Sequence, residues 1–282
     1  MRRIALYLTL ATVTLLFAQS SSSYRITHTY ALGADGSWDY IVPDPPNHRL
    51  FIARQNRLMV VDEDNGTLLG EVTGIQGAHG TALAPATGHG FATSGNDQSV
   101  VMFDLKTFQT LGRIPAAEDA DAILFDTASN RVFTLNGDAH SSTVIDPKAG
   151  TLITNIPLGG KPEYGASAGD GKVYANLTDT SEVVEIDAKS ASVARRWSTA
   201  PCKQPVAMAI DTARHRRSMR ALDSSDLSQQ LPGIFVHHHH ASLPGDEQTV
   251  IRWIGHDVVP ASVPSQGVGV GNTVSGRCLR EQ

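Results

Sequence analysis

The chain has 282 residues, of which 41% are hydrophobic, 6% aromatic and 18% charged, with 25 Gly, 14 Pro and 2 Cys. This composition excludes a collagen-like chain, a disordered chain and a cysteine-rich disulfide scaffold. The formal net charge of −5 also argues against the phosphate backbone of a nucleic acid as a partner, because that partner requires a basic surface.

The first 20 residues have the three parts of an export signal. Two arginines at positions 2 and 3 precede an apolar run, Ile4 to Ala18, and a small-x-small cleavage site ends at Ser20. The apolar run is shorter than the about 20 residues that a membrane-spanning helix needs. We expect residues 1–20 to be a signal peptide, with no transmembrane segment after its removal, and the protein to be periplasmic or secreted. The alternative is a retained N-terminal anchor.

An internal repeat dominates the rest of the chain. Four segments share an apolar run that ends in an aspartate, followed by a polar turn. The leading aspartates are spaced by 42, 42 and 41 residues: Asp62, Asp104, Asp146 and Asp187. Such a fixed period predicts a repeat architecture. A carboxylate before a tight turn accepts hydrogen bonds from the backbone N–H groups of the turn, so we expect these aspartates to be structural.

Each repeat contains short β-prone runs bounded by turn residues. One run recurs as Arg49 to Arg54, Gly90 to Gly95, Arg131 to Gly137 and Lys172 to Leu177. Four strands in about 42 residues, without helical periodicity, are typical of a propeller blade. The sequence therefore predicts an all-β fold, a β-propeller with four recognisable four-stranded blades.

Two flanking segments have strand character without a complete blade. Arg25 to Leu32 have the register of an outermost strand, which in a closed propeller completes the last blade. Val206 to Asp211 predict the innermost strand of a fifth blade. Arg217 and Ser218 then stand where the next strand requires an apolar pair, so the repeat stops there.

The boundary at 217 divides the expected propeller, residues 21–217, from a divergent or disordered tail, residues 218–282. One hypothesis is that a reading-frame change or similar rearrangement removed the remaining blades. The other is a genuine tail in which Gly233 to His240 and Thr249 to Val259 supply the middle strands of a fifth blade. The pairing of the two cysteines, at positions 202 and 278, is left open.

The repeats resemble those of a known family. Val173-Tyr174-Ala175-Asn176, the Ile-Asp or Val-Asp pair before a turn, and Ile156 to Pro162 are similar to the YVTN-type repeat of YncE-like propellers, over about Trp38 to Arg216. The resemblance implies an exported propeller from a family whose members mostly lack an assigned reaction. It carries over no catalytic residue and leaves the cofactor unknown. The departure after about Arg217 indicates a truncated or frame-changed member.

One group of chemically active residues follows from the propeller geometry. Alignment of the repeats places Asp39, His79, Asp121 and Glu163 at the start of the four innermost strands, which would bring them together around one mouth of the central channel. Three carboxylates and an imidazole could hold a hard cation or a polar ligand. The alternative is that they hydrogen-bond turn backbone between blades. Trp38, next to Asp39, would stack on a ligand at the rim or pack between blades.

Motifs for catalysis are absent from the sequence, including a G-x-S-x-G elbow, H-E-x-x-H and a phosphate-binding loop. We expect an exported, non-catalytic β-propeller that binds a small molecule, a metal ion or a protein at the propeller face, with its ligand unknown. The first alternative is a propeller enzyme, lactonase-like or quinoprotein-like, with a metal or cofactor at the channel mouth. The second is a truncated propeller without function.

Overall fold

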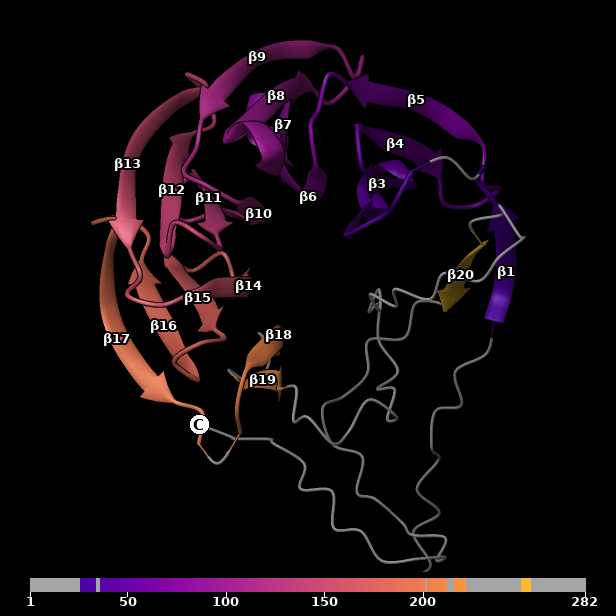
Figure 1. Ribbon diagram of the computed structural model, residues 1–282. Helices are drawn as coiled ribbons and strands as arrows, with labels where there is room; N and C mark the ends of the chain where they lie inside the picture. The colour runs from indigo at the N-terminus through magenta and orange to yellow at the C-terminus, as the bar shows by residue number, and fades with distance from the viewer. Residues whose placement is uncertain (1–25, 34–35, 201, 212–215, 222–249, 255–282) are drawn as a thin grey trace, which may run out of the picture.

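The computed structural model describes residues 26–33, 36–200, 202–211, 216–221 and 250–254 (Figure 1). The predicted signal peptide at residues 1–20, most of the predicted tail and Cys278 lie outside these ranges. Within the described residues, no helix is long and apolar enough to cross a bilayer.

Four antiparallel sheets of four strands follow one another along the chain, as the sequence predicts. Blade 1 contains β2 (Ile41–Asp44), β3 (Arg49–Arg54), β4 (Arg57–Asp62) and β5 (Leu68–Thr73). Blade 2 contains β6 (Ala78–Ala84), β7 (His89–Ser94), β8 (Ser99–Asp104) and β9 (Thr110–Pro115). Blade 3 contains β10 (Ala120–Asp126), β11 (Arg131–Asn136), β12 (Ser141–Asp146) and β13 (Thr151–Pro157). Blade 4 contains β14 (Pro162–Ser167), β15 (Lys172–Leu177), β16 (Glu182–Asp187) and β17 (Ser192–Ser198).

The blades form an arc in which the first strand of each blade lies nearest the centre and the last lies on the rim (Figure 1). The innermost strands contact their neighbours, β2 with β6, β6 with β10 and β10 with β14. We call the end where these strands begin the mouth face, and the end where they finish the far face. Because the strands alternate in direction, the turns between the second and third strands also lie on the mouth face.

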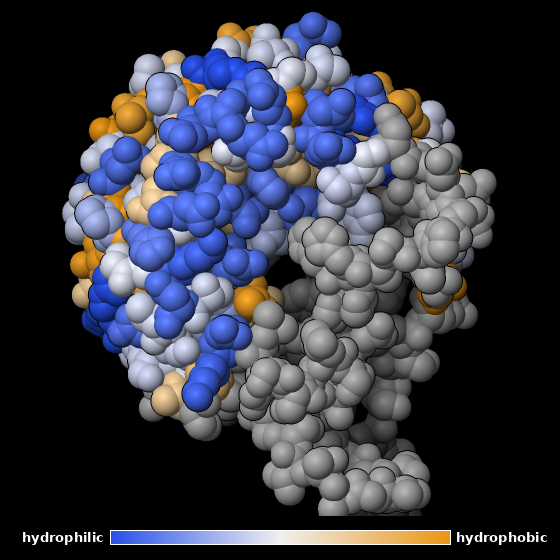
Figure 2. Space-filling view, in the orientation of Figure 1, coloured by the Kyte–Doolittle hydropathy of each residue, from blue (hydrophilic) through white to orange (hydrophobic). Residues whose placement is uncertain are grey.

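The burial of each strand depends on its place in the blade. The second and third strands, such as β3 and β4, are buried along almost their whole length, which explains their continuous apolar runs. The outermost strands expose several large apolar side chains: Leu68, Leu69, Leu111, Leu152 and Ile153. Figure 2 shows the visible face of the blades as largely hydrophilic, with hydrophobic residues at the rim.

The four marker aspartates are structural, as predicted. Asp62 Oδ1 accepts hydrogen bonds from the backbone N–H groups of Asp64, at 2.9 Å, and Asn65, at 3.1 Å. The equivalent carboxylates in the other blades accept backbone N–H groups from their own turns: Asp104, Asp146 and Asp187. The backbone N–H and the hydroxyl of Thr107 both donate to Asp104, and those of Ser190 both donate to Asp187. These hydrogen bonds, the backbone bond most strongly, lower the pKa of the two carboxyl groups.

The N-terminal segment forms a strand, as the sequence predicts, and this strand lies beside blade 1. It is β1 (Ile26–Ala31), and it pairs with β20 (Val250–Ile254), which falls within the segment that the divergent-tail hypothesis assigns to a fifth blade. The Tyr30 hydroxyl donates a 2.7 Å hydrogen bond to the carbonyl oxygen of Asp64 and so links β1 to blade 1. The other segment of that hypothesis, Gly233 to His240, lies outside the described residues.

The start of a fifth blade lies beside blade 4. β18 (Pro205–Asp211) contacts β14 and pairs with β19 (Arg216–Ala221). β19 continues past the boundary predicted at residue 217. The backbone hydrogen bonds of an antiparallel pair do not require apolar side chains. Cys202, between β17 and β18, is disulfide-bonded.

Candidate cation site at the mouth of the propeller

The structure brings three of the predicted site residues together on the mouth face. His79 Nδ1 lies 2.8 Å from Asp39 Oδ2 and 3.6 Å from Asp121 Oδ1, and the ligand atoms of the three side chains all lie within 4.8 Å of one another. His79 and Asp121 are the second residues of β6 and β10. Two innermost strands, β6 and β10, and the segment that leads into β2 therefore each supply one side chain to a single cluster.

Backbone hydrogen bonds fix the position of Asp39, although β2 begins only two residues later. Its backbone N–H donates to the carbonyl oxygen of Ala53 at 3.0 Å, and Ala53 N–H donates back to Tyr40, so the chain already runs along β3. The next blade is tied in by a 3.2 Å bond from Tyr40 N–H to the carbonyl oxygen of His79. These backbone bonds set the spacing between the carboxylate and the imidazole.

The protonation of the cluster is perturbed by burial and by charge. The hydrogen bond to Asp39 raises the pKa of His79, although burial acts in the opposite direction. Burial raises the pKa of Asp121 to about 7; the nearby imidazole opposes this shift, while Asp39 and Glu163 add to it. Asp121 Oδ1 is also buried and accepts no hydrogen bond from any described residue.

Glu163 lies on the mouth face and acts on the cluster through its charge, but it is not one of the three grouped ligands. It is the second residue of β14, the position equivalent to His79 and Asp121, and its carboxylate contributes to the raised pKa of Asp121. The Nζ atom of Lys161, two residues before Glu163, lies 2.8 Å from Asp138 Oδ1 and 3.9 Å from Asp119 Oδ2. This places a cation at the edge of the acidic cluster.

Two tyrosines that the sequence analysis missed meet next to the cluster. Tyr40 and Tyr164, from blades 1 and 4, have ring centroids 5.3 Å apart. The equivalent positions on the two intervening blades are Gly80 and Ala122, which leave room for the rings. Burial raises the pKa of both phenols, and for Tyr40 the carboxylates of the mouth add to the shift. At this repeat position the first and fourth blades carry a large side chain and the second and third a small one. That order was the sequence signal for the contact between the two tyrosines.

Trp38 comes directly before Asp39 in the chain. It is 38% exposed, so part of the residue faces solvent. That exposure fits a residue at the edge of the mouth, and its contact with a ligand stays a prediction.

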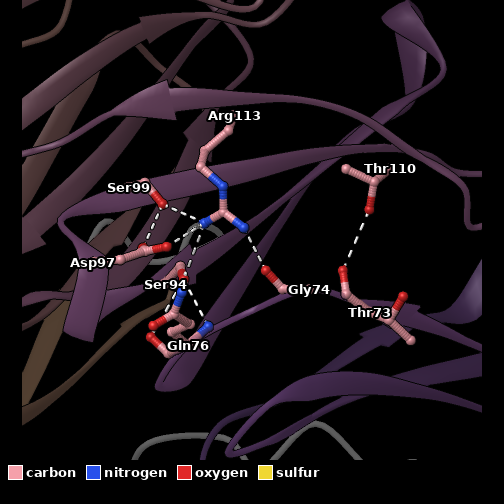
Figure 3. Close-up of polar contacts among 8 residues, drawn as sticks. All are labelled: Thr73, Gly74, Gln76, Ser94, Asp97, Ser99, Thr110 and Arg113. Atoms are coloured by element: carbon pink, nitrogen blue, oxygen red, sulfur yellow. Dashed lines mark hydrogen bonds and ion pairs between the residues drawn. The ribbon is translucent and has the colours of Figure 1, made fainter.

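An arginine fixes the segment that leads into the site (Figure 3). Arg113 of β9 donates to Asp97 Oδ2 at 2.6 Å and to Ser99 Oγ at 2.7 Å, and its other terminal nitrogen donates to the carbonyl oxygen of Gly74. Gly74 begins the connection from blade 1 to β6, on which His79 lies. In blade 4, Arg196 donates to the carbonyl oxygen of Leu158 in the same way.

Ser94 also binds the connection between β5 and β6. Ser94 Oγ accepts a 2.8 Å hydrogen bond from Gln76 N–H and lies 3.3 Å from the Gln76 carbonyl oxygen (Figure 3). Gly95, the next residue, lies so close to the imidazole of His79 that a Cβ there would be 3.1 Å from His79 Cδ2. The backbone of blade 2 thus packs against the ring and limits its rotation.

This arrangement suits a cation. One imidazole nitrogen and carboxylate oxygens are ligands for divalent metals, and separations of 2.8 and 3.6 Å between ligand atoms match those around one ion. Nδ1 cannot both donate to Asp39 and bind a metal, so a metal would replace that proton and relieve the repulsion between the carboxylates.

Comparison with known proteins identifies the fold. No family model matches the chain, and no curated protein matches it. Among solved structures, hydrazine synthase from Kuenenia stuttgartiensis aligns with a TM-score of 0.59 and 16% identity, over 67% of this chain and 55% of that one. The β-propeller domain of Cps50 (Swd1) from Myceliophteria thermophila aligns with a TM-score of 0.59 and 9% identity, over 71% and 65%. The chain is a β-propeller.

A third propeller structure, the dihydro-heme d1 dehydrogenase NirN, aligns with a TM-score of 0.54 and 15% identity, over 66% of this chain and 42% of that one. The chain thus spans less than two thirds of the length of each of these proteins. At such identities the likeness concerns the propeller fold alone.

Proposed function

We propose that this propeller is an exported, non-catalytic binding protein that holds a divalent cation at its mouth face, with Asp39, His79 and Asp121 as ligands. The observation that carries the proposal is the grouping of the three ligand atoms within 4.8 Å. The buried Asp121 Oδ1, which has no hydrogen-bond donor among the described residues, supports it, because a cation would compensate that oxygen.

The neighbourhood of the cluster favours binding over catalysis in this proposal. The tyrosines of blades 1 and 4 fill the space beside the ligands, and Arg113 fixes the segment that carries His79, so the ligands are held in place before a cation arrives. Trp38 and Glu163, at the edge of the mouth, are the residues we expect to contact a polar group that the cation recruits.

The test is a titration of the full-length protein with Mn²⁺, after removal of metals with EDTA, followed by calorimetry. Wild-type protein is expected to bind Mn²⁺, and Asp121→Asn and His79→Asn are each expected to weaken binding at least about tenfold. Asp138→Asn is the matched control, because this exposed carboxylate also lies on the mouth face but outside the cluster. Equal affinities in wild type and Asp121→Asn would disprove the mouth site.

A further inference from the structure

A second cluster of possible ligands lies at the opposite end of blade 1. His48 ends the 3-10 turn η1 (Pro45–Asn47) between β2 and β3, and Glu63 and Asp64 begin the turn after β4. His48 Nδ1 lies 3.1 Å from Asp64 Oδ2 and 3.6 Å from Glu63 Oε1, and the three ligand atoms lie within 4.8 Å of one another. Both turns are on the far face, so this cluster is separate from the mouth.

Blade 1 departs from the other blades at these three positions together. The residues equivalent to His48 are Gly88, Asn130 and Gly171. Those equivalent to Glu63 are Leu105, Pro147 and Ala188, and those equivalent to Asp64 are Lys106, Lys148 and Lys189. The equivalence is structural, since the backbone bond from Glu63 N–H to His48 O, at 3.0 Å, recurs in blade 2 from Leu105 to Gly88 at 2.9 Å.

The carboxylate of Glu63 is buried where other blades place an apolar side chain. Its side chain is 8% exposed, while the equivalent Leu105 and Ala188 are 9% and 0% exposed. Glu63 Oε2 is buried and has no hydrogen-bond partner among the described residues. Burying an uncompensated carboxylate oxygen is costly, and a cation bound beside Glu63 would offset that cost.

The turn that carries the two acids is held in place from both sides. The Tyr30 hydroxyl donates to the carbonyl oxygens of Asp64, at 2.7 Å, and Glu63, at 3.4 Å. Asp62 Oδ1 accepts the backbone N–H of Asp64 at 2.9 Å. Two elements therefore position the ligands before any metal binds, which lowers the entropy cost of binding.

We propose that His48, Glu63 and Asp64 form a second metal site, for a divalent transition ion of the Zn²⁺ type. An imidazole nitrogen with two carboxylate oxygens is a ligand set that such ions accept, with water completing the coordination. Asp64 and His48 are exposed, which gives the ion access, while the buried Glu63 supplies the charge that retains it.

The experiment is a Zn²⁺ titration of the full-length protein, followed by the imidazole resonances in proton NMR. The resonance absent from His48→Asn identifies His48. The substitution keeps the fold, because His48 has a φ of 48° and its equivalent Asn130 adopts 51°. In wild type the His48 resonance is expected to shift on binding, and His48→Asn is expected to lose one Zn²⁺ equivalent. Zn²⁺ bound by the histidine run at 237–240 is the same in every variant, so it does not affect the difference between wild type and variant.

Two further variants make the result specific. Asp64→Lys, which copies the other blades at an exposed position, is expected to weaken Zn²⁺ binding at His48 at least about tenfold. Asp121→Asn, at the mouth, is expected to leave it unchanged, so failure of one site is distinguishable from failure of the other. A His48 resonance that does not respond to Zn²⁺, or that responds equally in Asp64→Lys, would overturn the proposal.

Discussion

His79 and Asp39, 40 residues apart in the chain, are joined by a 2.8 Å hydrogen bond between Nδ1 and Oδ2. The bond crosses from blade 2 to blade 1, so one polar contact serves both the candidate site and the packing of neighbouring blades. Its energetic coupling can be measured directly.

We expect Asp39→Asn and His79→Gln to be non-additive in their effect on the free energy of unfolding. In the metal-free protein, a double-mutant cycle is expected to give a coupling energy of about 0.5–3 kcal/mol, the range for residues in contact. The measurement is urea unfolding in EDTA. Pairing Asp39→Asn with Asp170→Asn, an exposed carboxylate on the far face, should give additive effects; additivity in both cycles would contradict a contact between Asp39 and His79.

Gly90 is required by the packing of blade 2. It pairs across the strands with Phe103, and a Cβ at this position would collide with the Phe103 ring. Gly90→Ala should therefore lower the free energy of unfolding by about 1–3 kcal/mol. Gly112→Ala is the control, because a Cβ there meets nothing within 4 Å. Thermal melting checks both, and equal melting temperatures for the two variants would exclude this packing role.

Arg113 is expected to act through geometry rather than charge. Its guanidinium bridges Asp97, Ser99 and the Gly74 carbonyl, a combination that the single ammonium of lysine cannot reproduce (Figure 3). Because the side chain is 42% exposed, we expect Arg113→Ala to cost only about 1 kcal/mol.

The discriminating variant is Arg113→Lys, which should be nearly as destabilising as Arg113→Ala. Hydrogen exchange at the Gln76 amide should accelerate in both, since this segment loses the hydrogen bond from Arg113 to the carbonyl oxygen of Gly74. If lysine restores wild-type exchange, charge alone accounts for the contact.

Asp126 links blades 3 and 4 and makes stability depend on pH. Burial acts to raise its pKa, but hydrogen bonds from Ser129, Ser167 and Gly171 outweigh burial and lower it. A carboxyl with a lowered folded pKa stabilises the protein above its unfolded value of about 3.9, and this contribution is lost as the pH falls through the folded pKa.

We therefore expect Asp126→Asn to reduce the free energy of unfolding at pH 7, and the difference from wild type to shrink below about pH 4. Urea unfolding of both proteins between pH 3 and pH 7 measures this difference. Asp170→Asn, which removes an exposed carboxylate nearby, is the control. A difference that does not change with pH would show that the charge of Asp126 is not involved.

Much of the candidate site was predictable because the repeat converts sequence position into spatial position. Asp39, His79 and Asp121 occupy one place in three successive repeats, so blade geometry alone brings them to one end of the propeller. The cluster of His48, Glu63 and Asp64 carried a weaker signal, the simultaneous departure of blade 1 from three repeat positions. It becomes visible only when the structure shows that Glu63 is buried.

The sequence by itself determined the architecture: four blades, their strands, the structural aspartates and the two flanking strands. It did so because strand alternation, turn residues and a fixed period are local properties that recur four times. Only the tertiary structure decided which side chains meet. The contact of Tyr40 with Tyr164, from the first and fourth blades, depends on how far the arc curves, and that follows from packing between whole blades.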